Sequence, residues 1–136
     1  MTLIKTISLK PLGDNRGSLV SLESNNNIPF DIKRVYYIFD TKEGVSRGYH
    51  AHKNLKQVAI CVKGSCRFIL DDGINPQEDI VLNSSTTGLI IEGMTWREMH
   101  DFSDDCVLIV LADSVYDAAD YVRDYQEFMK MVSYDS

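Results

Sequence analysis

Two histidines, one residue apart, are the residues of this chain best suited to proton chemistry. They are His50 and His52, in the segment RGYHAHKNLKQ at residues 47–57. Alternate residues of an extended strand project from one face about 7 Å apart, so a strand here puts both imidazoles on one face. An imidazole accepts and donates protons near neutral pH and also binds metals. The pair is therefore compatible with a metal site, a proton-transfer site or a chance pair of surface histidines.

The residues around the pair argue against a metal. From residue 44 to residue 64 the chain reads Gly, five residues, His, one residue, His, four residues, Gln, six residues, Gly, which resembles the first signature of the cupin superfamily. Metal-binding cupins carry a glutamate where this chain has Gln57. Near the place where the second signature supplies another histidine stands Arg97, a permanent cation that repels a metal. Two good ligands are too few for a tight divalent site, so we predict no metal and histidines free for proton transfer.

Longer segments narrow the resemblance. RGYHAHKNLKQVAICVKGSCRFILDDG and WREMHDFSDDCVLIVLADSVYD, with the sequence around them from Gly13 to Phe128, resemble the dTDP-sugar 3,4-ketoisomerases, which are cupins. The resemblance implies an isomerase that converts dTDP-4-keto-6-deoxy-D-glucose into a dTDP-3-keto-6-deoxyhexose, on the route to dTDP-3-amino sugars for surface glycans. It also implies a homodimer without a metal requirement, in which His50 and His52 are catalytic. Arg97 departs from the pattern, since a histidine is common there, and its role stays open.

Moving a ketone from C4 to C3 requires a proton to leave C3, an enediol to form and a proton to return at C4. Two histidines on one face can divide this work, and no redox cofactor is needed. Tyr37 is the third catalytic candidate, because Val35, Tyr37 and Phe39 form an apolar face that we expect to point into the barrel. Its phenol could hydrogen-bond the ketone oxygen, or it could be an ordinary core tyrosine.

A dTDP-linked substrate also needs cations for its pyrophosphate and a surface for its base. Arg47, three residues before the histidine pair, is the first candidate, because a guanidinium offers a planar fork of donors. Arg16, Lys53 and Arg67 are further candidates. Trp96, the one tryptophan, could stack on thymine or fill the core.

Many short apolar segments separated by turn residues must position these groups. Such strands at regular spacing indicate an all-β fold, and the resemblance makes it a cupin-type antiparallel jelly-roll barrel. From residue 117 onward, Tyr121, Tyr125, Phe128 and Val132 recur at helical spacing, which predicts a short C-terminal helix on the barrel. The predicted strands, besides the one that carries the histidines, are 18–23, 34–40, 57–64, 66–73, 79–85, 88–93 and 106–112.

Composition limits the classes of partner. Residues 1–136 are expected to form a single domain.

A net charge of −6 argues against nucleic acid and against anionic membranes as partners of this protein. No apolar run reaches membrane-spanning length and no signal peptide is evident, which predicts a cytoplasmic protein. Cys61, Cys66 and Cys106 lack metal-type spacing and are expected to be reduced, buried thiols.

Three other functions remain open at this level. A dTDP-sugar 3,5-epimerase has a similar barrel, and a non-catalytic sugar-binding cupin could keep the fold without the chemistry. A metal-dependent oxygenase cupin would need a bound metal. The sequence does not reveal the C4 stereochemistry of a ketoisomerase product, because that depends on which face receives the proton.

Overall fold

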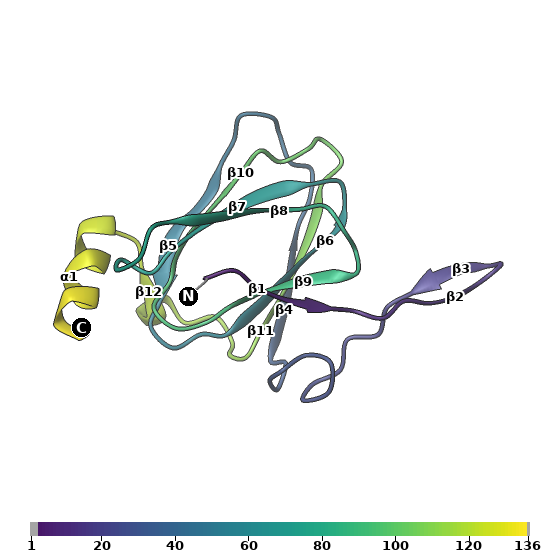
Figure 1. Ribbon diagram of the computed structural model, residues 1–136, viewed down its shortest axis with the longest axis horizontal. Helices are drawn as coiled ribbons and strands as arrows, with labels where there is room; N and C mark the ends of the chain where they lie inside the picture. The colour runs from purple at the N-terminus through teal and green to yellow at the C-terminus, as the bar shows by residue number, and fades with distance from the viewer. Residues whose placement is uncertain (1–2, 136) are drawn as a thin grey trace.

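Two five-stranded antiparallel sheets face each other in a computed structural model that describes residues 3–135 (Figure 1). The first sheet has the order β1 (Lys5–Ser8), β9 (Thr87–Ile91), β6 (Gln57–Lys63), β11 (Val107–Ala112) and β4 (Arg34–Ile38). The second has the order β12 (Tyr121–Val122), β5 (Arg47–His52), β10 (Trp96–His100), β7 (Cys66–Asp71) and β8 (Glu78–Leu82). This all-β, jelly-roll-like arrangement confirms the predicted fold class.

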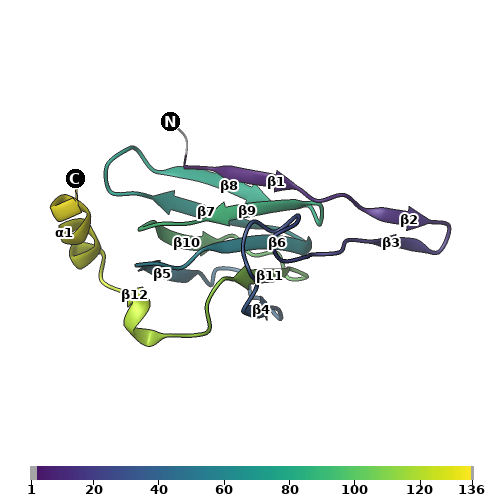
Figure 2. The same cartoon turned by 90° about the horizontal axis from the view of Figure 1, so that it is seen from below.

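The predicted strands coincide with observed strands to within a few residues, with one exception. In the segment predicted as 18–23, the strand β3 (Gly17–Leu19) ends early and pairs only with β2 (Leu12–Asp14). Together β2 and β3 form a hairpin that projects from the barrel at the end opposite the C-terminal helix (Figure 2). Leu12 and Leu19 on this hairpin are more than half exposed.

The core fills the space between the sheets. Its centre includes Phe68, Leu70, Leu89 and Leu108, which alternate along their strands with residues on the outer faces. The three cysteines belong to the same core, are buried and free, and their sulfur atoms lie within 4.8 Å of one another. The prediction of buried, unpaired thiols is confirmed.

The C-terminal helix begins later than the aromatic spacing predicts. A 3-10 turn, η1 (Ala118–Asp120), and the short strand β12 come first, and α1 spans Tyr125–Asp135. The Asp124 carboxylate accepts the backbone N–H of Gln126 at 2.8 Å, which caps the new helix. Tyr121 is therefore a strand residue beside β5 and lies outside the helix. No helix among the described residues is long and apolar enough to cross a membrane.

Candidate active site

A bulge in β5 precedes the two histidines. His50 pairs with Arg97 of β10 and Gly48 pairs with Glu98, so Tyr49 is an extra residue between them. Gly48 has φ +93°, and a Cβ there would lie 2.9 Å from the Arg97 carbonyl oxygen. Only glycine fits this close approach without strain. The bulge thus sets the direction in which β5 approaches His50 and His52.

The two imidazoles lie together, as the strand pattern predicts, but in different surroundings. Their ring centroids are 4.9 Å apart and their planes are nearly perpendicular. His50 is partly exposed and lines a cavity, whereas His52 is only 1% exposed. The ring of Tyr121 lies against both, with centroid distances of 5.0 and 4.3 Å.

A carboxylate fixes the orientation of the buried histidine. Asp120 Oδ2 lies 2.9 Å from His52 Nδ1, and Oδ1 accepts the backbone N–H groups of Lys53 and Asn54. Because an ionised carboxylate only accepts, Nδ1 of neutral His52 carries the hydrogen and Nε2 keeps its lone pair. Nε2 has no hydrogen-bond partner among the residues that the structure describes.

Both histidines are held in the neutral form. Burial first, and then the nearby charge of Arg97, lower the pKa of His50 from its usual 6.5 to about 4. The same two causes, in the same order, lower the pKa of His52, although Asp120 acts in the opposite direction. A neutral imidazole at pH 7 can accept a proton from a carbon acid.

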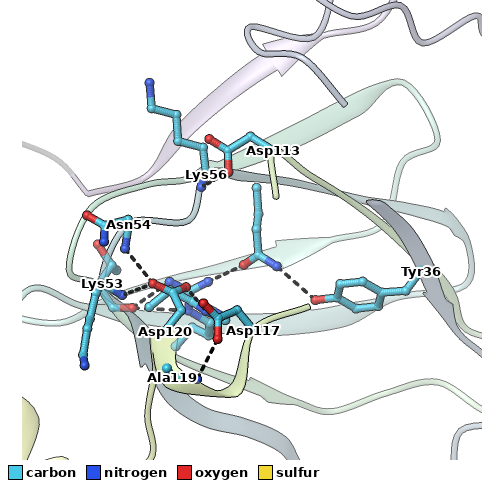
Figure 3. A network of polar contacts seen from close by, with 12 residues as sticks. Tyr36, Lys53, Asn54, Lys56, Asp113, Asp117, Ala119 and Asp120 are labelled. Carbon is cyan, nitrogen blue, oxygen red and sulfur yellow. Dashed lines mark hydrogen bonds and ion pairs between the residues drawn. The ribbon is translucent and has the colours of Figure 1, made fainter. Parts of the chain in front are cut away.

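Arg97, whose role the sequence left open, is a buried structural cation. It is 2% exposed, and its Nε and Nη2 donate to the Thr95 carbonyl oxygen at 3.2 and 2.9 Å. Its Nη1 donates to Gln57 Oε1, and Gln57 Nε2 donates to the Tyr36 hydroxyl at 3.1 Å. Figure 3 shows this polar network, with Tyr36 at one side and Asp120, Lys53 and Asn54 at the other.

A cavity of about 530 Å³ opens in front of His50. It is lined by Arg34, Tyr36, Ile38, Arg47, Gly48, His50, Met99, Tyr116, Tyr121 and Arg123. The guanidinium of Arg34 lies 5.0 Å from the ring centre of Tyr36, and that of Arg123 lies 4.2 Å from the ring centre of Tyr121. Three arginines, three tyrosines and a neutral histidine thus share one cavity, which can hold an anion beside a group that moves protons.

The predicted face of β4 is wrong by one residue. Tyr37 is 62% exposed and packs beside Phe39 on the outside of the barrel, whereas Tyr36 and Ile38 face the cavity. Successive strand residues point to opposite faces, so a single step in phase exchanges the two tyrosines. In this strand the outer face is the more apolar one.

Arg47 lines the cavity as expected, but the other four predicted binding residues do not. Trp96 is 3% exposed and packs on Tyr125 and Phe128, beneath the helix. Arg67 forms ion pairs with Asp79 and Asp101 on the surface.

Lys53 is likewise absent from the cavity lining, since its side chain is exposed and its backbone N–H binds Asp120. Arg16 lies on the projecting hairpin, paired with Asp14. Arg34 and Arg123 were missed by the sequence reasoning, although the adjacent aromatic residues of RVYY and DYVR were a usable signal.

Comparisons with known proteins identify the family of this chain. The family model described as "FdtA: WxcM-like, C-terminal" matches residues 2–133. The chain is 56% identical over 129 residues to TDP-4-oxo-6-deoxy-alpha-D-glucose-3,4-oxoisomerase of Aneurinibacillus thermoaerophilus, covering 95% of this chain and 92% of the relative.

Solved structures give the same result. A 3,4-ketoisomerase from Helicobacter canadensis is 48% identical and has a TM-score of 0.92, with 96% of this chain and 97% of that chain covered. A histidine-to-asparagine variant of the 3,4-ketoisomerase QdtA from Thermoanaerobacterium thermosaccharolyticum, in complex with TDP-4-keto-6-deoxyglucose, is 40% identical with a TM-score of 0.94 and coverages of 98% and 96%. The chain therefore belongs to the FdtA, WxcM-like family, the family of the sugar 3,4-ketoisomerases.

Proposed function

We propose that this protein is an isomerase that converts dTDP-4-keto-6-deoxy-D-glucose into a dTDP-3-keto-6-deoxyhexose by acid–base proton transfer through an enediol. The observation that carries the proposal is that His50, neutral at pH 7, and the phenol of Tyr36 line one cavity. The relatives support the substrate, since one is named as a TDP-4-oxo-6-deoxy-glucose 3,4-oxoisomerase and another binds TDP-4-keto-6-deoxyglucose.

The proposed proton path uses the groups that line the cavity. The ketone at C4 acidifies the proton on C3, and His50 Nε2 or Nδ1 takes that proton because His50 is the histidine that faces the cavity. Tyr36 donates its hydroxyl proton to O4, which gives the enediol. The phenolate then takes the O3 proton and the imidazolium of His50 gives a proton to C4, which leaves a ketone at C3 and restores both groups. Atoms and charge balance, and no electron leaves the substrate.

His52 acts behind His50 in this scheme. It is buried, it does not line the main cavity, and Asp120 fixes its ring. The unpaired Nε2 and the perpendicular contact with His50 make it a group that orients the base and can receive its proton. This assigns the two histidines different roles, with His50 as the carbon base.

We propose that the reaction uses no metal. Gln57, at the usual ligand position, donates to Tyr36 and accepts from Arg97, and the Arg97 guanidinium lies beside both histidines. A divalent cation placed there would meet a fixed positive charge and a ligand already engaged on both atoms.

The three cavity arginines are the anchors that we propose for the pyrophosphate. Arg34, Arg47 and Arg123 converge from β4, from β5 and from the segment after β12. A guanidinium can donate two parallel hydrogen bonds to two oxygens of a phosphate. The rings of Tyr116 and Tyr121 offer flat surfaces on which the thymine could stack.

We propose that two copies form a homodimer. Val35, Tyr37 and Phe39 expose more than half of their surface on the outside of β4, and the β2–β3 hairpin projects with Leu12 and Leu19 uncovered. A second copy would cover both surfaces, and its hairpin could carry Arg16 toward the cavity, which the chain's own hairpin does not reach. Arg16 thereby remains a proposed binding residue, supplied in trans.

We further place the reaction in the cytoplasm, where three free thiols persist. The product would feed an aminotransferase step toward a dTDP-3-amino sugar for surface glycans.

The test is incubation of purified protein with dTDP-4-keto-6-deoxy-D-glucose, followed by NMR of the product. A ketone at C3 is the expected result, and the coupling of H4 reports whether C4 is gluco or galacto. Inversion at C5 with the ketone still at C4 would identify an epimerase. Tight binding without any conversion would identify a sugar-binding protein.

A further inference from the structure

Gln57 lies between two groups with different hydrogen-bonding abilities. On one side is Arg97, whose guanidinium has donors and no acceptor, and on the other is the Tyr36 hydroxyl, which can donate or accept. Gln57 is 2% exposed, so water does not substitute for either partner. Its primary amide has an acceptor end and a donor end.

Arg97 determines which end faces which partner. A guanidinium can bind only the amide oxygen, so the amide nitrogen must point to Tyr36. The Tyr36 oxygen then accepts a hydrogen bond from Gln57, at 3.1 Å, and keeps its own hydrogen for another acceptor. Because Tyr36 and His50 line the same cavity, this hydrogen is available to an acceptor on a molecule bound there.

We propose that Gln57 is a positioning residue that, held by Arg97, fixes the direction of the Tyr36 hydroxyl bond so that the phenol donates its proton to the substrate ketone. This inference rests on the proposed function and adds a residue that touches no substrate. It also gives a reason for the difference at this position from metal-binding cupins, which carry a glutamate. A glutamate would accept from both Arg97 and Tyr36, and it would hold the phenol proton away from the substrate.

The same arrangement suits the charge that forms when Tyr36 gives up its proton. Burial raises the pKa of Tyr36, while the Gln57 amide donor and the Arg97 charge oppose that rise. A phenolate next to an amide N–H, with a cation behind it, is stabilised for the short time in which it waits for the O3 proton.

A double-mutant cycle tests the proposal. Gln57→Glu replaces the amide NH2 group by an oxygen and keeps the size of the side chain. We expect kcat to fall about 10²-fold to 10³-fold, the usual loss when a donor to a developing charge is removed. The dissociation constant for dTDP, measured by calorimetry, should stay within about twofold, since the arginines are untouched. Gln126→Glu on the exposed face of α1 adds the same charge and should leave kcat unchanged.

The informative comparison is made without the phenol. In a Tyr36→Phe background, adding Gln57→Glu should lower kcat no further, because Gln57 acts only through Tyr36. If Gln57→Glu does not fold, as judged by circular dichroism, the same cycle is run with Gln57→Met, which removes the donor and adds no acceptor.

Two outcomes would overturn the inference. One is a folded Gln57 variant that turns over like the Gln126→Glu control. The other is a kcat loss that persists at full size in the Tyr36→Phe background, which would indicate a structural role. Failure of the wild-type protein to convert the substrate at all would instead reject the proposed function.

Discussion

At the scale of single residues, the two histidines differ from a free imidazole in being neutral well below pH 6.5. An imidazole in water is half protonated near pH 6.5, which would leave a large part of a catalytic base inactive in mildly acidic solution. Here burial and Arg97 hold the pKa of His50 at about 4. The base is therefore ready at neutral pH and over a wide range below it.

This predicts the acid limb of the pH profile. The neutral form of His50 is active, so kcat/KM should stay nearly constant from pH 7 to pH 5 and fall as the pH approaches 4. A limb centred between pH 6 and 6.5 would contradict the assignment of His50 as the base.

Stability must be followed in parallel with the pH profile. Both histidines have a folded pKa below the unfolded value, so the unfolded chain binds more protons between pH 6.5 and 4. The free energy of unfolding should therefore decrease on acidification through that window. Circular dichroism at each pH separates loss of the fold from protonation of the base.

Metal removal is a second prediction at this scale. The Gln57 side-chain oxygen accepts a hydrogen bond from Arg97, which leaves it unavailable to a metal. Turnover should therefore survive dialysis against EDTA unchanged. The check is the rate before and after dialysis, and after addition of a divalent ion. Loss on dialysis with recovery on adding the ion would reject the metal-free mechanism.

At the scale of elements, the strand β5 positions the chemistry, and its bulge depends on glycine. Gly48→Ala should strain the backbone, since φ is +93°, and should also push a Cβ against the Arg97 carbonyl. Gly44→Ala is the matched control, because φ is +80° but no atom lies within 4 Å. Both variants should lose about 1–2 kcal/mol of unfolding free energy from the positive φ.

Only Gly48→Ala should lose more than this and also lose kcat, because it moves His50 relative to Arg97. Denaturation curves and turnover, measured for both variants, make the comparison. Equal stability and equal activity of the two variants would mean that the close approach at Gly48 does not position the histidine.

The elements also explain what the sequence could and could not predict. The common face of His50 and His52 was predictable, because alternate residues of a strand point to the same side whatever surrounds the strand. The choice between Tyr36 and Tyr37 was not, since the more apolar face of β4, which carries Tyr37, lies outside, and only the fold decides which face lies inside.

The start of the helix shows a related limit. Tyr121 and Tyr125 fit a helical period, yet β12 pairs with β5 and Asp124 caps the helix after it. The aromatic period therefore could not separate a strand residue of the active site from a helix residue. The aromatic neighbours of Arg34 and Arg123 marked them as candidates, but their meeting with Arg47 depends on β4, β5 and the segment after β12 being folded together.

At the scale of the whole molecule, the uncovered outer face and the hairpin predict assembly. Light scattering should give twice the chain mass of 15.4 kDa. Tyr37→Asp places a charge on the outer face of β4 and should shift the protein toward monomer. Ile74→Asp, at an equally exposed site on the β7–β8 turn, should not.

The assembly of two copies also predicts a role for Arg16 in binding dTDP. If the partner's hairpin completes the cavity, Arg16→Ala should weaken binding of dTDP by about 10-fold to 100-fold, since a charge-assisted hydrogen bond contributes about 1.5–3 kcal/mol. A monomeric wild-type protein would contradict the homodimer, and an unchanged dissociation constant would remove Arg16 from the site.

The central claim is that His50 moves a proton at carbon, and solvent-deuterium exchange tests it most directly. Wild-type protein in D2O should place deuterium at C4 of the product and at C3 of recovered substrate, read by NMR. His50→Asn, folded by circular dichroism, should lose both exchanges and about 10²-fold to 10⁴-fold in turnover, the range for one acid–base group. A folded His50→Asn variant that exchanges and converts like wild type would contradict the account.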